Sequence, residues 1–233
     1  MMLQAQPADD IADAFANRII PSDAHPKRSH NPSSILKCQR RQVYDWIQVP
    51  QESTFTPQAR DLMDSGTAIE KEMAAKWYLS LGYGVLEGQK VVEDPTLPMR
   101  GKIDFTIRKG EYDFPVELKT VGCNKFNRCT KQPEFDHYAQ VQCYILLTNS
   151  TRIILHYYDR CEGRHFPWYI SPDGTLLQTI RQRCATINAA VATAELGMIA
   201  RERKPDFDEK GVARGDYECR GCPYTKKCLE DGE

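Results

Sequence analysis

The sequence lacks the long apolar runs that a membrane protein needs. No stretch approaches the roughly 18 consecutive apolar residues of a membrane span, and the first residues show no basic segment followed by an apolar one, as a secretory signal would. We therefore expect a cytoplasmic protein with no membrane partner. Hydrophobic residues make up 41% of the 233 residues and charged residues 27%, which is typical of a globular protein with a real core.

An excess of positive charge is also missing. The formal net charge is −1, so no global field attracts nucleic acid, and any such contact must use local basic patches. The nine cysteines are an odd number, and in a reducing compartment thiols stay free or bind metals. This argues against a disulfide framework.

The order of apolar patterns predicts an α/β protein with one mixed β-sheet flanked by helices. Strands are expected at residues 85–93, twice within 101–120, and at 152–158 and 165–170. Helices are expected to begin near Ser33 or Ser34 and at His137, and to span residues 58–81 and 176–203. Residues 1–30 are expected to be a partly ordered arm, and residues 31–233 a single domain.

Residues 101–120 read as two short strands joined by a tight turn at Lys109-Gly110. Because side chains alternate between the two faces of a strand, Glu117 and Lys119 share a face, and the hairpin can bring Asp104 beside them. The opposite face is apolar, with Ile103, Phe105, Ile107, Val116 and Leu118. Two carboxylates and one ammonium group therefore converge above an apolar sheet.

Such a group of charges suits a phosphodiesterase that depends on a divalent metal. Asp104 and Glu117 are suitable ligands for a hard cation such as Mg²⁺, and Lys119 could orient or help deprotonate a water, or stabilise charge on a phosphate. The alternative is the charged outer face of a solvated antiparallel hairpin.

Asp104 followed by Glu117-Leu118-Lys119 resembles the signature of the PD-(D/E)XK nucleases, and of their RecB-like members in particular. The resemblance implies a restriction-endonuclease-like core, with the Leu118 carbonyl as a further metal ligand. RecB-like nucleases carry a metal-binding His four residues after a Gly that corresponds to Gly66. This chain has Glu70 there, which is either a hard ligand for Mg²⁺ or Mn²⁺ or a solvated residue.

Gln140 and Tyr144 lie one turn apart on the helix that is expected after the Glu-x-Lys strand, so they share a face. The Gln-x-x-x-Tyr spacing resembles a RecB-like motif, which implies that Gln140 lies near the phosphate and that Tyr144 contacts DNA. The intervening segment is expected to be a basic loop, in which Lys125 and Arg128 either contact the substrate or are merely solvated.

Cys219, Cys222 and Cys228 form a C-x2-C-x5-C cluster, which needs a fourth ligand for a four-coordinate site. The sequence has no second C-x2-C pair of the kind that zinc ribbons use, and Cys38 is the candidate. One cysteine before and three after the core resembles the iron–sulfur staple of AddB-type nuclease domains and of the CRISPR-associated Cas-four exonucleases. The resemblance implies a [4Fe-4S] cluster that joins the two ends of the chain, with zinc as the alternative.

Together these resemblances imply a Mg²⁺- or Mn²⁺-dependent exonuclease that acts on single-stranded DNA. They place it in CRISPR adaptation or in phage replication and recombination, with a complex of that kind as its partner. Arg40 and Arg41, beside Cys38, join Lys125 and Arg128 as expected DNA contacts. No Walker A motif is present, so any unwinding would come from a partner. The competing classes are a non-catalytic DNA- or protein-binding subunit stabilised by the cluster, and a zinc-ribbon regulator.

Overall fold

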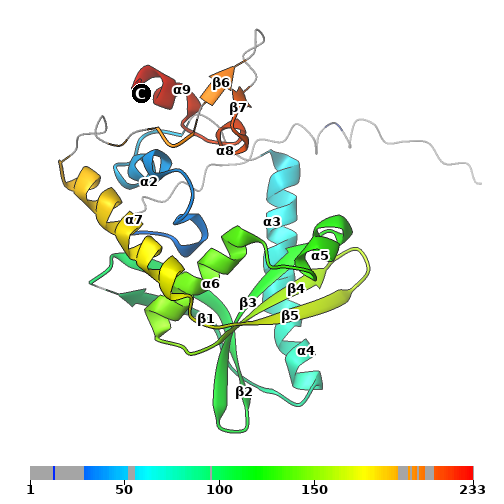
Figure 1. The fold of residues 1–233 in the computed structure, drawn as a ribbon. Helices are drawn as coiled ribbons and strands as arrows, with labels where there is room; N and C mark the ends of the chain where they lie inside the picture. The colour runs from blue at the N-terminus through cyan, green and yellow to red at the C-terminus, as the bar shows by residue number, and fades with distance from the viewer. Residues whose placement is uncertain are drawn as a thin grey trace, which may run out of the picture.

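The computed structural model describes residues 13, 29–51, 56–94, 96–193, 199, 201–203, 205–207 and 213–232. The arm expected at residues 1–30 lies outside this part of the chain except for residues 13, 29 and 30. Figure 1 shows a curled sheet with helices on both faces and a smaller group of elements from the two ends of the chain above it. None of the described helices is both long and apolar enough to span a bilayer.

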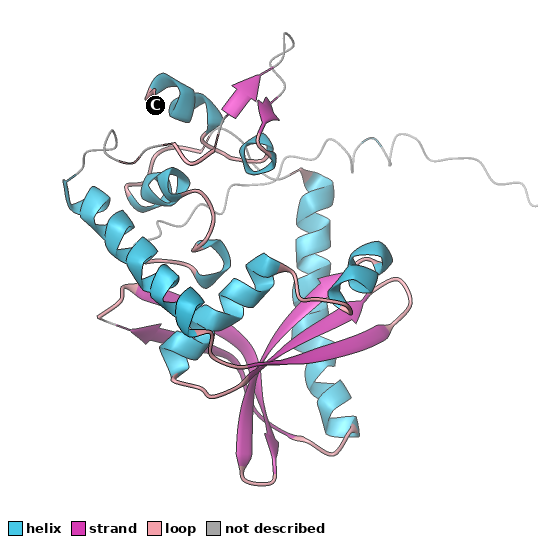
Figure 2. Ribbon diagram, viewed as in Figure 1, coloured by secondary structure: helices cyan, strands magenta, loops and turns pink. Residues whose placement is uncertain are grey.

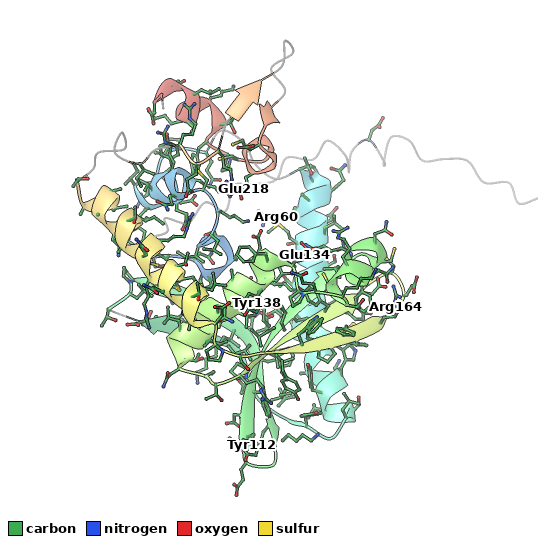
Figure 3. All side chains as sticks on the ribbon, in the orientation of Figure 1. Arg60, Tyr112, Glu134, Tyr138, Arg164 and Glu218 are labelled. Atoms are coloured by element: carbon green, nitrogen blue, oxygen red, sulfur yellow. The ribbon has the colours of Figure 1, made fainter. Side chains whose placement is uncertain are left out.

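The main sheet has five strands in the order β1-β2-β3-β4-β5, shown in magenta in Figure 2. Their bounds are β1 Gly84–Asp94, β2 Met99–Lys109, β3 Tyr112–Val121, β4 Ile153–Asp159 and β5 Arg164–Ile170. All neighbouring strands are antiparallel except β3 and β4, which are parallel. The mixed α/β sheet and the turn at Gly110 (φ 62°) are confirmed, and Tyr112 marks the tip of the β2–β3 hairpin (Figure 3).

Two helical layers cover one face of the sheet and one covers the other. The helix α6, Phe135–Thr148, packs on the sheet through Val141, Tyr144 and Ile145. The helix α7, Gly174–Thr193, packs in turn against α6. On the opposite face the helix α4, Ala75–Ser80, contributes Tyr78 to a core with Phe105, Ile107, Val116 and Leu118. Both faces of β3 are therefore buried, as a strand in the middle of a mixed sheet requires.

The first helices differ from the expected ones because Asn31, rather than Ser33 or Ser34, caps the first helical turn. Asn31 caps the 3₁₀ helix η1, Pro32–Ser34, by accepting a hydrogen bond from the Ser33 amide at 3.1 Å. The next helix, α2, then spans Gln39–Trp46. Ser33 and Ser34 are thus inside the first turn rather than at its cap, and Cys38 lies directly before α2 rather than one turn into a helix.

The helix expected at residues 58–81 is present. The ordinary helical period of its sequence predicts a buried apolar stripe of Leu62, Ile69, Met73, Trp77 and Leu81, and this prediction is partly wrong. It consists of α3, Pro57–Ile69, a π-helical turn η2, Glu70–Ala74, and α4. A π turn spaces like positions five residues apart, so Ala74 rather than Met73 follows Ile69 toward the sheet. Met73 is consequently exposed. Leu62, which precedes the π turn, is also exposed, and α3 buries none of its residues.

Two further segments depart from expectation. The basic stretch after β3 is not an open loop, because it contains the helix α5, Cys123–Cys129, which buries Phe126 and Cys129 against the sheet. The described part of the last long helix, α7, reaches Thr193, and residues 199 and 201–203, which were expected to belong to it, are not helical. The short sheet of β6, Pro205–Phe207, and β7, Ala213–Gly215, follows. The helices α8, Tyr217–Arg220, and α9, Thr225–Glu230, complete the chain.

Candidate active site and cysteine pocket

The candidate active site begins where the β2–β3 ladder ends. The last paired residues are Phe105 and Val116, and from Val116 onward β3 pairs with β4 on its other side. Beyond this point the Asp104 side chain replaces the β2 backbone as a hydrogen-bond partner of β3, since its Oδ2 accepts a hydrogen bond from the Leu118 amide at 2.7 Å. The end of the ladder leaves room for polar side chains at the centre of a buried sheet.

Glu117 lies at this point and is only 3% exposed. Its Oε1 atom accepts hydrogen bonds from Lys119 Nζ at 2.6 Å and from Gln140 Nε2 at 2.8 Å. Lys119 Nζ also donates to Gln140 Oε1 at 2.8 Å, which closes a triangle of three side chains. The Oε2 atom of Glu117 is buried and has no hydrogen-bond partner among the described residues. This burial excludes the alternative of a solvated outer face.

A third carboxylate adds negative charge. Burial, together with the charges of Glu117 and Glu70, raises the pKa of Asp104 well above its ordinary range. Burial also raises the pKa of Glu117. Glu70 is the first residue of the π turn η2. From the sequence, it was expected to be either a metal ligand or a solvated residue. The three acidic residues, one each from η2, β2 and β3, therefore repel one another, and a bound cation would reduce this repulsion.

Lys119 remains a cation in this setting. Burial alone would lower its pKa, but the carboxylates of Glu117, Asp104 and Glu70 outweigh that effect and raise it. A lysine with a raised pKa holds its proton, so the site favours Lys119 as a fixed positive charge over a proton acceptor. Of the roles expected for Lys119, orienting a water or stabilising a phosphate fits better than deprotonation.

Tyr144 is 3% exposed, so its expected contact with DNA is not available at the surface. Its hydroxyl donates to the Lys102 carbonyl oxygen at 2.9 Å and accepts from Gln140 Nε2 at 3.1 Å. The shared helix face expected for Gln140 and Tyr144 is present. Tyr144 acts on the site through Gln140, whose amide it orients.

The donor set at this site fits a hard divalent cation, because it offers carboxylate oxygens, one of which accepts no hydrogen bond from any described residue. One oxygen of each carboxylate already accepts a hydrogen bond within the chain: Asp104 Oδ2 accepts from the Leu118 amide, and Glu117 Oε1 accepts from Lys119. Among the described residues, no group of three or more His, Cys, Asp or Glu side chains is already arranged to hold a single ion.

The four expected DNA contacts have different positions. Arg40 is 2% exposed and donates to backbone carbonyls, so it is a structural residue and the expected contact is wrong. Arg41 faces the cysteine pocket described below, and its buried Nε atom has no partner among the described residues. On α5, Lys125 is half-buried and Arg128 is exposed, 3.6 Å from the Glu134 carboxylate at the start of α6 (Figure 3).

His137 is a residue near the site that the sequence did not reveal. Its Nδ1 atom lies 3.0 Å from the Tyr157 hydroxyl, which itself accepts from the Glu134 amide. Burial, with the positive charges of Lys119, Lys125 and Lys37, lowers the pKa of His137 to about 3. The imidazole is therefore neutral at physiological pH. A lone His at the start of a helix carries no sequence signal for this position.

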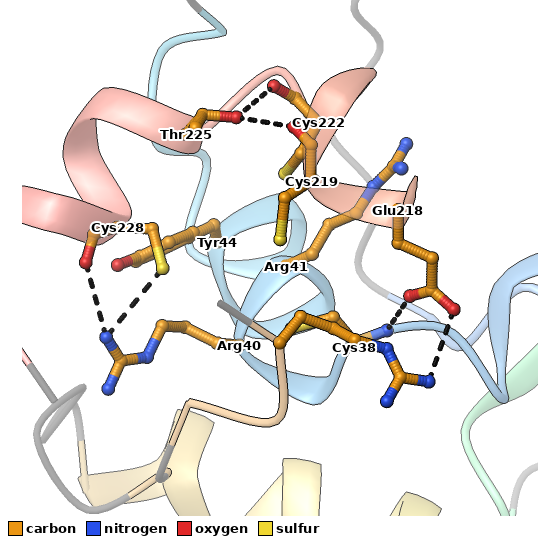
Figure 4. Close-up of a pocket in the computed structure, with 10 residues that line it drawn as sticks. Cys38, Arg40, Arg41, Tyr44, Glu218, Cys219, Cys222, Thr225 and Cys228 are labelled. Carbon is orange, nitrogen blue, oxygen red and sulfur yellow. Dashed lines mark hydrogen bonds and ion pairs between the residues drawn. The ribbon is translucent and has the colours of Figure 1, made fainter. Parts of the chain in front are cut away.

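The cysteines Cys38, Cys219, Cys222 and Cys228 line one pocket, shown in Figure 4, although the first is far from the others in sequence. The Thr225 hydroxyl fixes the C-terminal loop, because its oxygen lies 2.9 Å from the carbonyl oxygens of both Cys219 and Cys222 and its single proton is shared between them. Glu218 accepts from the Cys38 amide at 3.2 Å, which holds the N-terminal segment against the loop.

No protein-family model matches the sequence, and no curated protein matches it. The alkaline exonuclease of Laribacter hongkongensis superposes with a TM-score of 0.56 at 17% identity, over 72% of this chain and 89% of that enzyme. The same enzyme in complex with dAMP gives 0.58 at 17% identity, over 74% and 92%. A phage-related exonuclease from Haemophilus somnus 129PT gives 0.50 at 11% identity, over 67% and 80%. The chain shares the fold of these exonucleases.

Proposed function

We propose that this protein is a Mg²⁺- or Mn²⁺-dependent DNA exonuclease. The observation that carries the proposal is the Glu117 carboxylate. Lys119 and Gln140 hold one of its oxygens, and the other is buried without a hydrogen-bond partner from the residues that the structure describes. A buried unpaired carboxylate oxygen is costly unless a ligand uses it. Its location, at the end of a ladder in a fold shared with exonucleases, supports phosphodiester cleavage.

Each residue has a role in this proposal. Asp104, Glu117 and the Leu118 carbonyl hold the divalent ion, with Glu70 as the further acidic ligand. When bound, the ion supplies Lewis-acid polarisation of the scissile phosphate and makes a nearby water more acidic. Lys119 orients the attacking water and stabilises negative charge on the phosphate, because it remains protonated. Gln140 fixes both Glu117 and Lys119, and Tyr144 fixes Gln140.

DNA is the substrate class that the neighbours support, since both are exonucleases and one was solved with dAMP. Lys125 and Arg128 on α5 are the proposed contacts to its phosphates. Single-stranded DNA, CRISPR adaptation or phage replication and recombination, and a complex in such a pathway, are parts of this proposal that follow from the sequence resemblance.

A [4Fe-4S] cluster on Cys38, Cys219, Cys222 and Cys228 is a second part of the proposal. In such a cluster each cysteine binds its own iron, so the four thiols need not converge on one ion. The Arg41 Nε atom beside the thiols, which has no hydrogen-bond partner in the described part of the chain, suits the negative charge of a thiolate-bound cluster. The cluster would be structural and would join the chain ends. Iron and labile sulfide in anaerobically purified protein, both lost in Cys38→Ala, are the expected result, whereas zinc without sulfide contradicts it.

The decisive experiment is degradation of end-labelled single-stranded DNA with Mn²⁺. We compare the wild type with Lys119→Ala, and use Lys76→Ala, at an exposed lysine of α4, as the matched control. Cleavage by the wild type and the control that is lost in Lys119→Ala is expected. If the intact wild type binds DNA but does not cleave single- or double-stranded substrates, the protein is a binding subunit and the nuclease proposal is wrong.

A further inference from the structure

Gln89 has an unusual backbone conformation in the middle of β1. Its φ angle is 55°, in the left-handed region that residues with a side chain rarely adopt. The flanking pairs are Gly88 with Phe105 and Lys90 with Ile103, which sets Gln89 opposite Asp104 in the register. Strained backbone of this kind persists only where the surroundings enforce it, and it is concentrated at functional sites.

The Gln89 side chain bridges two charged residues. Its Nε2 atom donates to Glu70 Oε1 at 2.8 Å, and its Oε1 atom accepts from Lys102 Nζ at 2.5 Å. An amide can donate and accept at the same time, so both contacts are made with full hydrogen-bond complementarity. The second carboxylate oxygen of Glu70 accepts no hydrogen bond from the described residues.

These contacts complete a chain of hydrogen bonds around the candidate active site. The Lys102 ammonium donates a hydrogen bond to Gln89, and the Lys102 backbone carbonyl accepts one from the Tyr144 hydroxyl. Tyr144 in turn accepts from Gln140, and Gln140 donates to Glu117. Glu70 on η2 and Glu117 on β3 are thereby connected through β1, β2 and α6.

Gln89 supplies a fixed donor to Glu70. Glu70 lies at the start of the π turn η2, and its carboxylate accepts the hydrogen bond from Gln89. Because a glutamate side chain has several rotatable bonds, this donor fixes where the carboxylate points. Removing a polar group that orients a metal ligand in this way commonly weakens metal binding by about 10–100-fold.

We propose that Gln89 is a positioning residue that holds the Glu70 carboxylate toward Asp104 and Glu117, so that Glu70 can bind the divalent cation. This rests on the proposed function. The left-handed backbone at Gln89 is what aims the amide at Glu70, and the Lys102 ammonium fixes which end of the amide faces the carboxylate.

The test measures Mn²⁺ binding to the full chain by calorimetry, independently of cleavage. Gln89→Ala and Gln89→Gly both remove the amide, and the Gly variant also relieves the backbone. We expect both to bind Mn²⁺ about 10-fold more weakly, with cleavage recovering at high Mn²⁺. The matched control is Gln48→Ala, because Gln48 is an exposed glutamine with a φ angle of 63°. Wild-type affinity in both Gln89 variants would overturn the proposal.

A double variant separates positioning from a general effect on the fold. In a Glu70→Gln background, Gln89→Ala is expected to cause no further loss of Mn²⁺ affinity, because the group that it positions is already gone. Additive losses would overturn the proposal even if each single variant binds more weakly. A wild type that binds Mn²⁺ in this pattern but cleaves no DNA would refute the nuclease function and leave the role of Gln89 standing. A wild type that binds no Mn²⁺ refutes both.

Discussion

Arg40 reaches Cys228 across 188 positions of sequence, with its Nη1 atom 3.5 Å from the Cys228 carbonyl and 3.8 Å from the thiol. The same guanidinium donates to the Ile199 carbonyl through Nε and Nη2, and to the Gly232 carbonyl at 2.5 Å. One buried cation therefore joins the N-terminal helix α2 to three separate points of the C-terminal segment.

Replacing Arg40 should destabilise the protein. In Arg40→Met the apolar stem is retained, but the Ile199 carbonyl loses its charged donor, whereas Arg201 still donates to the carbonyls of Cys228 and Gly232. We expect the free energy of unfolding in urea to fall by about 1–3 kcal/mol, the usual cost of a buried acceptor that is left without its donor. Arg100→Met is the control, because that side chain is 61% exposed and should change stability by less than about 0.5 kcal/mol. Equal effects at the two positions would contradict the structural role of Arg40.

Gly101 allows β2 to pack directly against α6. A Cβ at this position would lie 2.6 Å from Tyr144 Cε1 and 2.8 Å from Pro32 Cγ, so one of them must move. Gly101→Ala should therefore lower the free energy of unfolding by about 1–3 kcal/mol, and displacing Tyr144 should slow DNA cleavage as well.

The control for this change is Gly84→Ala on the neighbouring strand, where the nearest atom is at an ordinary 3.6 Å. Chemical denaturation of both variants, together with their cleavage rates, checks the prediction. A Gly101→Ala variant as stable and as active as Gly84→Ala would show that the close approach of Tyr144 does not matter.

Removing the Asp104 charge should stabilise the metal-free protein while abolishing cleavage. Because the pKa of Asp104 is raised in the folded state, its stabilising effect is present below the pKa of the unfolded chain and is lost as the pH rises. At neutral pH, Asp104→Asn keeps an acceptor for the Leu118 amide without the repulsion from Glu117 and Glu70. We expect a gain of about 1 kcal/mol, measured by urea unfolding with a chelator present. A loss of stability would contradict it.

With Mn²⁺ added, the wild type should become more stable than Asp104→Asn. The cation is expected to stabilise the wild type by binding the folded state, and to stabilise Asp104→Asn much less. Thermal unfolding with and without Mn²⁺ measures both effects. The same Mn²⁺-induced shift in the two proteins would remove Asp104 from the ligand set.

His156 makes the fold sensitive to acid. Burial, together with the adjacent His165, lowers its pKa to about 4, and its ring lies 3.1 Å from the Tyr78 hydroxyl and 3.1 Å from His165. A lowered His pKa means that the unfolded chain takes up the proton first, so stability is lost as the pH falls from about 6.5 toward 4.

Between about pH 7 and pH 5 this single residue should account for about 2 kcal/mol of lost stability. The variant His156→Gln should show a correspondingly smaller difference between the two pH values in urea unfolding. An unchanged difference would assign the acid sensitivity to other groups, among them His30 and His137, whose pKa values are also lowered by burial.

The local part of the site could be predicted from the sequence because it depends on short-range geometry. Strand alternation and the turn at Gly110 bring Asp104, Glu117 and Lys119 together, and a spacing of four residues puts Gln140 against Tyr144. Spacing alone grouped Cys219, Cys222 and Cys228, and the resemblance to a staple of one cysteine before and three after the core added Cys38, which lines the same pocket.

The remaining features depend on packing that no local pattern encodes. The burial of Arg40 is set by carbonyls that lie more than 150 positions away. The left-handed backbone of Gln89 is imposed by its neighbours in the sheet, since glutamine has no preference for that conformation. The π turn shifts the buried positions by one residue, so the ordinary helical period predicts a buried Met73 where the structure buries Ala74.

The pocket that Cys38 shares with Cys219, Cys222 and Cys228 also sets an order of events during synthesis. A ribosome makes the N-terminal wall of this pocket early and its C-terminal wall last. Because chains are synthesised at about 5–20 residues per second, Cys38 and Arg40 wait for roughly 10 seconds or more for their partners. All five strands of the main sheet are therefore synthesised before Cys219, and a truncated chain released before that residue would lack the closure between its ends.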